Sequence, residues 1–198
     1  MKEKIKSRVK ELKKELVLEE ATSYFEEVGF EALKMQDLAK KCKISVGALY
    51  QLFGSKENLF YEYILRQINI FYQNLLKKCE NAKSPEEKLK IFIKLKFETF
   101  SKKPKIIQDP IAGDPLFFYK LNRKKGNPAQ IILEFLAREF ENLNKKNALK
   151  SKNFLETAYV FNSFTFGYIE FWLDYDGNLE EKTEEAYRIF IEGILKKS

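Results

Sequence analysis

Residues 24–60 read YFEEVGFEALKMQDLAKKCKISVGALYQLFGSKENLF, and the order of apolar and capping residues in this stretch decides the fold. Apolar side chains recur every three or four positions, which is the spacing of one helix face. Gly29 stands where a helix would end in a left-handed conformation, and Ser45 stands where it would cap the helix that follows. The stretch therefore predicts short helices over 35–39 and 45–53. Two short helices joined by a tight turn are the layout of a helix-turn-helix.

The helical spacing continues on both sides of this stretch. A helix is expected from Ile5 to Val28, and a long one from Leu59 to Cys79. No segment shows the sustained alternation of a strand, so we expect an all-α protein of about nine helices. We expect a helix-turn-helix domain over 1–60 and a second helical domain over 61–198, with the long helix running between them. Further helices are predicted to open at Ser84-Pro85, Asp114-Pro115 and Asn127-Pro128 and to span 152–175 and 179–197.

The second short helix has the features of a helix that reads DNA. Gly47 and Ala48 are small, which lets a helix approach base edges in the major groove. Tyr50 can give its hydroxyl to a phosphate, and the Gln51 amide can pair with adenine. Lys56 falls in the first turn of the next helix, where free N–H groups favour an anion. The alternative is a small helical bundle whose surface happens to be basic.

The motifs in this region resemble the N-terminal DNA-binding domain of TetR-family transcriptional regulators. The resemblance implies a dimer of all-helical subunits whose larger C-terminal domain binds a small effector and carries the dimer interface. The matching residues are Phe25, Gly29-Phe30, Asp37-Leu38-Ala39, Ile44-Ser45, Gly47, Leu49-Tyr50, Phe53 and Ser55-Lys56-Glu57 with Leu59.

The chain departs from the family pattern at a few positions. Leu33-Lys34 stands where the family usually has Thr or Ser, so the helix cap is lost and the Lys34 charge is expected to replace the phosphate contact. Lys43 stands where the turn usually has Gly, which requires a non-glycine residue in a left-handed conformation. Ala48 and Gln51 also replace frequent family residues. The predicted DNA-binding residues are Lys34, Ser45, Val46, Gly47, Ala48, Tyr50, Gln51 and Lys56.

Composition limits the chemistry. The 198 residues include no histidine and two cysteines, which excludes His-dependent nucleophiles and thiolate or imidazole zinc sites. We predict no catalytic residues, no metal and no cofactor. The net charge is +7, and residues 1–14 and 34–56 hold basic clusters, which favours nucleic acid or an acidic surface as partner. With no secretory signal and no membrane span, a cytoplasmic protein is expected.

The second domain is rich in aromatic residues, and its sequence favours an apolar or aromatic effector. Asn162 and Thr165 are polar groups one turn apart within an aromatic stretch, so they are the predicted effector-orienting groups. Simple core packing of the aromatics and helix contacts of the polar pair are the alternatives. The predicted effector-binding residues are Phe92, Phe97, Phe117, Phe118, Phe135, Asn162, Thr165 and Phe166.

The last two helices are the expected dimer interface. Residues 154–173 are apolar on nearly all sides, which requires burial by more than one neighbour. A homodimer formed through residues 152–197 would supply it as an intersubunit four-helix bundle. A central core helix in a monomer is the alternative.

The sequence therefore favours a ligand-responsive, DNA-binding repressor that an apolar or aromatic small molecule releases from a palindromic operator. A helical small-molecule-binding protein or enzyme with a vestigial helix-turn-helix is a second reading, and sequence-nonspecific DNA coating is a third. The basic run from Lys2 to Lys14 is interpreted as a solvated extension of the first helix, with a minor-groove arm as the alternative.

Overall fold

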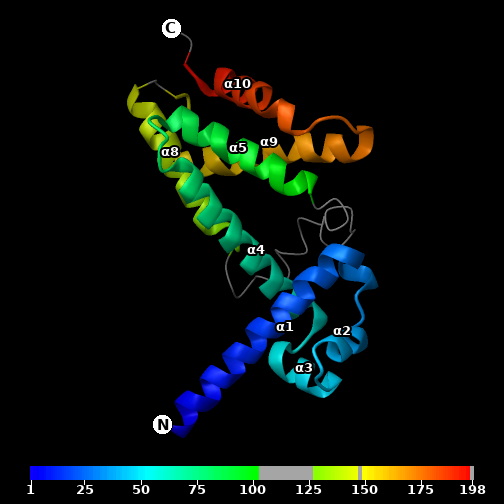
Figure 1. Cartoon of the computed structure of the whole chain (residues 1–198). Helices are drawn as coiled ribbons and strands as arrows, with labels where there is room; N and C mark the ends of the chain where they lie inside the picture. The colour runs from blue at the N-terminus through cyan, green and yellow to red at the C-terminus, as the bar shows by residue number, and fades with distance from the viewer. Residues whose placement is uncertain (103–126, 147–148, 197–198) are drawn as a thin grey trace. The chain divides into compact units, whose positions relative to one another are not determined.

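The computed structural model describes residues 1–102, 127–146 and 149–196. The all-α prediction is confirmed: within these ranges the only strand-like feature is an isolated bridge between Leu149 and Leu195. The chain forms two compact units. Of the described residues, the first unit holds 1–67 and 127, and the second holds 68–102, 128–146 and 149–196. The helices are α1 (Lys2–Ala32), α2 (Met35–Lys41), α3 (Val46–Phe53), α4 (Lys56–Cys79), α5 (Pro85–Ser101), α8 (Gln130–Lys146), α9 (Phe154–Tyr175) and α10 (Thr183–Ile194), with a 3-10 turn at Glu180–Lys182 (Figure 1).

The first unit packs α1, α2, α3 and the start of α4 around one apolar core. Phe60 is fully buried, and its ring centroid lies 5.0 Å from that of Phe25 and 4.8 Å from that of Phe30. Leu38 of α2 and Leu49 of α3 are also fully buried. These contacts hold the two short helices against α1 and α4, so that their opposite faces are left to solvent.

Several predicted boundaries are confirmed and others shift. Gly29 has φ 83° inside α1, so the predicted left-handed break is present, although the helix resumes to Ala32. The N-terminal basic run is helical from Lys2, as the extension reading expects. The predicted helix over 179–197 is shorter, because a 3-10 turn precedes α10 and α10 ends at Ile194. The helix predicted at Asp114-Pro115 lies outside the described residues.

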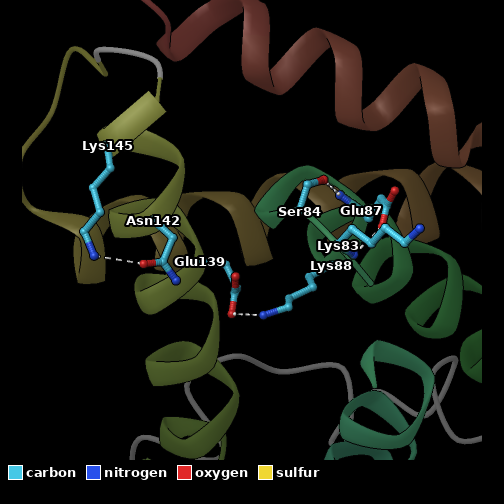
Figure 2. Close-up of polar contacts among 7 residues, drawn as sticks. All are labelled: Lys83, Ser84, Glu87, Lys88, Glu139, Asn142 and Lys145. Carbon is cyan, nitrogen blue, oxygen red and sulfur yellow. Dashed lines mark hydrogen bonds and ion pairs between the residues drawn. The ribbon is translucent and has the colours of Figure 1, made fainter. Parts of the chain in front are cut away.

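In the second unit, α5 contacts α8, α9 and α10, and α8 also contacts α9 (Figure 1). The start of α5 shows the predicted cap: the backbone N–H of Glu87 donates to Ser84 Oγ over 3.2 Å. The Glu87 carboxylate accepts from the Lys83 N–H at 2.7 Å (Figure 2). The reciprocal bonds fix where α5 begins.

Aromatic rings fill the centre of the second unit. The ring of Phe161 on α9 lies 5.3 Å from Phe140 on α8, 4.8 Å from Phe190 on α10 and 5.8 Å from Phe92 on α5. The Phe161 ring of α9 thus lies against rings from three other helices, α5, α8 and α10. No helix among the described residues is long and apolar enough to cross a membrane.

Candidate functional site

The turn between α2 and α3 has the tight geometry that the sequence predicts. Lys43 has φ 53°, so a lysine takes the left-handed conformation that glycine adopts more easily. The turn is closed by the backbone bond from the Ile44 N–H to the Ala39 carbonyl, at 3.0 Å. Ser45 then caps α3 by accepting from the Ala48 N–H at 3.1 Å. These features fix the direction in which α3 leaves the turn.

Three of the predicted DNA-binding residues, Gly47, Tyr50 and Gln51, lie on the outer face of α3. Gly47 and Gln51 are exposed, and Tyr50 is 45% exposed. Leu49 and Phe53 of the same helix are buried in the core of the first unit. The exposed residues make up the polar surface of α3 that is available to a partner. Ser45 is also exposed and Ala48 is half-buried. Val46 was predicted to face outward, but it is half-buried and packs against the apolar core of the first unit.

The two lysines predicted to bind phosphate differ in their surroundings. Lys34 is exposed in the segment between α1 and α2. Lys56 donates its Nζ to the backbone carbonyl of Glu31 at 3.0 Å, and its ammonium lies 4.6 Å from the centroid of the Phe30 ring. Lys56 therefore ties the start of α4 to the end of α1, and a phosphate contact would have to compete with those bonds.

A basic groove runs beside α3 and was not predicted. Its volume is about 760 Å³, and both Ala48 and Gln51 of α3 line it. Two acidic residues, Glu19 and Glu20, also line it. The lysines of the groove come from the N-terminal turns of α1, the end of α2 and the turn after it, so the extension of α1 brings charge next to α3. They are Lys6, Lys10, Lys13, Lys41 and Lys43.

In the second unit, the predicted effector-binding aromatics are mostly core residues. Phe92, Phe97 and Phe135 are buried, while Phe166 is half-buried against the Phe100 ring, centroid to centroid 6.0 Å. Phe117 and Phe118 lie outside the described residues. A groove of about 660 Å³ on this unit is lined by residues such as Lys90, Tyr187 and Arg188, and none of the predicted effector residues lines it.

The predicted polar pair of α9 meets a lysine that sequence reasoning missed. Lys96 of α5 is 5% exposed, and its Nζ donates to Asn162 Oδ1 at 3.0 Å, to the Asn162 carbonyl at 2.8 Å and to Thr165 Oγ1 at 3.0 Å. Burial lowers the pKa of Lys96 to about 7. A signal was present in the sequence, because Lys96 falls on the apolar stripe of its helix, one turn from both Phe92 and Phe100.

Neither cysteine is prepared for thiolate chemistry. Burial raises the pKa of the Cys79 thiol to about 11 and also raises that of Cys42, where Glu20 adds to the effect. Among the described residues, no group of three or more Cys, Asp or Glu side chains is placed to hold a metal ion.

Residues 17–63 match the family model described as "Bacterial regulatory proteins, tetR family". Among curated proteins, the regulator YuxN of Bacillus subtilis is 36% identical over 72 residues, which is 36% of this chain and 23% of that protein. UidR of Escherichia coli is 24% identical over 183 residues, which is 92% of each chain. The family match thus lies in the unit that contains the helix-turn-helix.

Solved structures of related regulators share the fold over most of the chain. The fatty acid degradation regulator FadR from Bacillus halodurans has a TM-score of 0.72 at 16% identity and covers 91% of this chain and 95% of its own. FadR of Thermus thermophilus, solved in complex with lauroyl-CoA, has a TM-score of 0.68 at 18% identity and covers 93% and 96%.

A helix-turn-helix unit followed by a second helical unit is the architecture of all-helical DNA-binding regulators. The match over residues 17–63, together with the shared fold, supports a transcriptional regulator of the TetR type. Its relatives are regulators and not enzymes, which agrees with the prediction from its composition.

Proposed function

We propose that the protein is a ligand-responsive repressor that binds a palindromic operator as a homodimer and leaves it when an apolar or aromatic small molecule binds. The observation that carries the proposal is the outer face of α3. This face presents Gly47, Tyr50 and Gln51 to solvent beside a groove lined by lysines. A small residue for close approach, an amide for a base edge and nearby cations for phosphates are what major-groove reading requires.

The dimer surface is proposed to be the exposed side of α9. Leu155, Tyr159, Phe171 and Tyr175 are 40%, 43%, 62% and 71% exposed. Together with Ser163 and Gly167, which are also exposed, they form a ridge with a residue at every fourth position. Ridges of this spacing interlock with a copy of themselves at a crossing angle of about −50°. The small residues at the centre of the ridge would let two α9 helices approach closely.

A dimer of this kind would present two α3 helices to DNA. Two recognition helices separated by about 34 Å would enter successive major grooves on one side of the duplex, which makes the operator palindromic. An effector that favours a different separation would weaken DNA binding by reciprocal coupling. The aromatic residues of the second unit support an apolar effector, as does the lauroyl-CoA seen with the Thermus thermophilus neighbour.

The test is selection of random duplex DNA by the purified protein at two salt concentrations. Enrichment of a palindrome whose affinity falls steeply at higher salt is the expected result, because phosphate contacts release counterions. Binding without sequence preference would identify a DNA-coating protein. No binding to DNA in the absence of effector would favour the small-molecule-binding reading.

Point variants then test the assigned contacts on the selected operator. Tyr50→Phe and Lys56→Ala are each expected to weaken binding, and Gln51→Ala is expected to relax base preference at one position. Lys94→Ala is the matched control, because Lys94 is exposed on α5 in the other unit. Wild-type affinity and preference in all three variants would remove these residues from the interface.

The dimer surface has its own test. Gly167→Arg places a long charged side chain at the centre of the α9 ridge, where a Cβ would meet no atom within 4 Å in the single chain. The variant should fold and sediment as a monomer, while Glu170→Arg, exposed on the same helix but off the ridge, should remain dimeric. Dimeric Gly167→Arg would exclude this ridge as the interface.

A further inference from the structure

The cluster around Lys96 is the feature of the second unit that its fold does not explain. The side chain is almost wholly buried between α5 and α9. A buried lysine is costly unless its charge is compensated, because burial removes the ammonium from water. Hydrophobic residues occupy the neighbouring positions on the same face of α5, so packing alone would favour another apolar residue at this position.

The surroundings of the ammonium are polar but neutral. Its three N–H donors reach Thr165 Oγ1 and the side-chain and backbone oxygens of Asn162, which is the full donor capacity of a lysine. The rings of Phe92 and Phe166 lie 5.7 and 5.6 Å away. Each of these contacts stabilises the positive charge without neutralising it.

No carboxylate among the described residues forms an ion pair with Lys96. The acidic residue nearest to it along α5, Glu98, lies 3.6 Å from Lys78 in an ion pair of its own. Desolvation is the sole cause of the lowered pKa of Lys96, in agreement with the absence of a charged neighbour in the described structure. Among the described residues, the cluster therefore lacks an anion to match the ammonium.

We propose that Lys96 is the anchor for an acidic group on the effector, so that the effector is an apolar or aromatic molecule carrying a carboxylate. The inference rests on the proposed function, since it specifies the chemical class of the effector. The carboxylate would replace Asn162 Oδ1 as acceptor of one ammonium N–H, while the bonds to the Asn162 carbonyl and to Thr165 remain. A turned Asn162 amide could then donate its own N–H to the second carboxylate oxygen.

Such a ligand would reach the Lys96 ammonium past Asn162 and Phe166. Both residues are half-buried, whereas Lys96 and Thr165, which contact Asn162, are buried. Movement of the Asn162 side chain would uncover the ammonium without breaking the ring contacts of Phe92 with Phe161. The apolar part of the ligand would then lie against Phe166 and Phe100, which are in edge contact.

The experiment compares acids with neutral molecules of the same shape. Octanoate and octanamide form one pair of probes, and 2-naphthoate and 2-naphthamide form the other, with binding to the full chain measured by calorimetry at pH 6.5. At least one acid should bind the wild type roughly tenfold to a hundredfold more tightly than its amide, which is the range for a charged hydrogen bond. Lys96→Met should lose this preference, and Lys94→Met, a control on the exposed side of α5, should keep it.

Each other outcome overturns the proposal. Amides that bind as tightly as the acids would leave an apolar effector but exclude the acidic class. Acids that bind equally to the wild type and to Lys96→Met would exclude Lys96, and failure of all four probes would exclude both ligand classes. The operator affinity of the same ligand-free samples is measured separately. An absence of DNA binding would contradict the proposed repressor function and not the assignment of Lys96 as the anchor.

A second measurement needs no variant and covers the case in which Lys96→Met does not fold. An acid that binds the ammonium stabilises its protonated form, so binding at pH 8 should take up about one proton. Calorimetry in two buffers of different ionisation enthalpy counts that proton. Binding of the acid without proton uptake would exclude contact with Lys96.

Discussion

Lys88 Nζ lies 3.1 Å from Oε1 of Glu139, and this ion pair joins α5 to α8 (Figure 2). The Glu139 side chain is 4% exposed, whereas that of Lys88 is 29% exposed. The other carboxylate oxygen of Glu139 is buried and has no hydrogen-bond partner in the described structure. The charge of Glu139 is therefore compensated by a single contact, so that contact has a large effect on stability.

We expect Lys88→Met to destabilise the protein by about 1–3 kcal/mol, because it leaves a buried carboxylate without a cation. Lys78→Met is the matched control. It breaks the ion pair with Glu98, in which the lysine side chain is 49% exposed, and should cost less than about 1 kcal/mol. Urea unfolding of the two variants measures the difference. Equal losses would mean that burial of Glu139 does not decide the strength of its pair.

Gly47 offers a test that separates folding from DNA binding. A Cβ at this position would meet only Ser45 Oγ, at 3.9 Å, which is an ordinary contact. Gly47→Ala should therefore fold and gain up to about 1 kcal/mol of stability, because alanine favours a helix. Operator affinity should nevertheless fall, since the added methyl group lies on the outer face of α3. Thermal unfolding and operator titration of one preparation measure both effects, and unchanged affinity would place Gly47 away from the bases.

Lys43 is the one position of the helix-turn-helix where the local conformation opposes the residue type. Its φ of 53° is costly for a side chain with a Cβ. Lys43→Gly should raise the free energy of unfolding by about 0.5–1 kcal/mol. The substitution relieves the backbone strain, and the larger conformational entropy that glycine loses on folding offsets part of that gain. Lys43→Ala also removes the charge but keeps the Cβ, so it should show no such gain. A similar gain in both variants would assign the effect to charge.

The sequence predicted the local structure of the first unit well, because caps and turns act over a few residues. Ser45 and Ser84 each cap a helix as predicted, and Ser55 caps α4 in the same way. Gly29 and Lys43 both have the expected positive φ. The outward face of α3 followed from the same helical spacing, since the buried positions of a short helix define its exposed ones. Whether that face binds DNA stays a prediction.

The second unit was harder to interpret because its contacts are long-range. Periodicity identifies Phe92 and Phe97 as apolar-face residues, but it cannot separate a closed core from a pocket wall. Asn162 and Thr165 are a pair of polar groups in the sequence, yet Lys96, which donates to both, lies 66 and 69 residues away. The basic groove beside α3 likewise depends on residues that are far apart in sequence, since the start of α1 and the turn after α2 both line it.

Lys96 should also make stability depend on pH in a specific window. Its pKa is lowered from 10.5 to about 7 by burial in the folded chain. Between these two values the unfolded chain binds a proton that the folded chain does not, so stability should rise with pH across the window. Below pH 7 the folded and the unfolded chain both carry the proton. The destabilisation caused by the buried ammonium is then at its greatest and no longer changes with pH.

The wild type should accordingly be less stable than Lys96→Met at pH 6, and the gap should narrow by about 1 kcal/mol per unit as the pH rises from 7 to 9. Urea unfolding at one protein concentration measures the gap, and comparison with Lys96→Met cancels the other titrating groups. Lys94→Met, an exposed change on the same helix, should follow the pH dependence of the wild type. A difference in stability that does not change with pH would show that Lys96 keeps its proton in the folded chain. The difference depends on pH only if Lys96 loses its proton on folding.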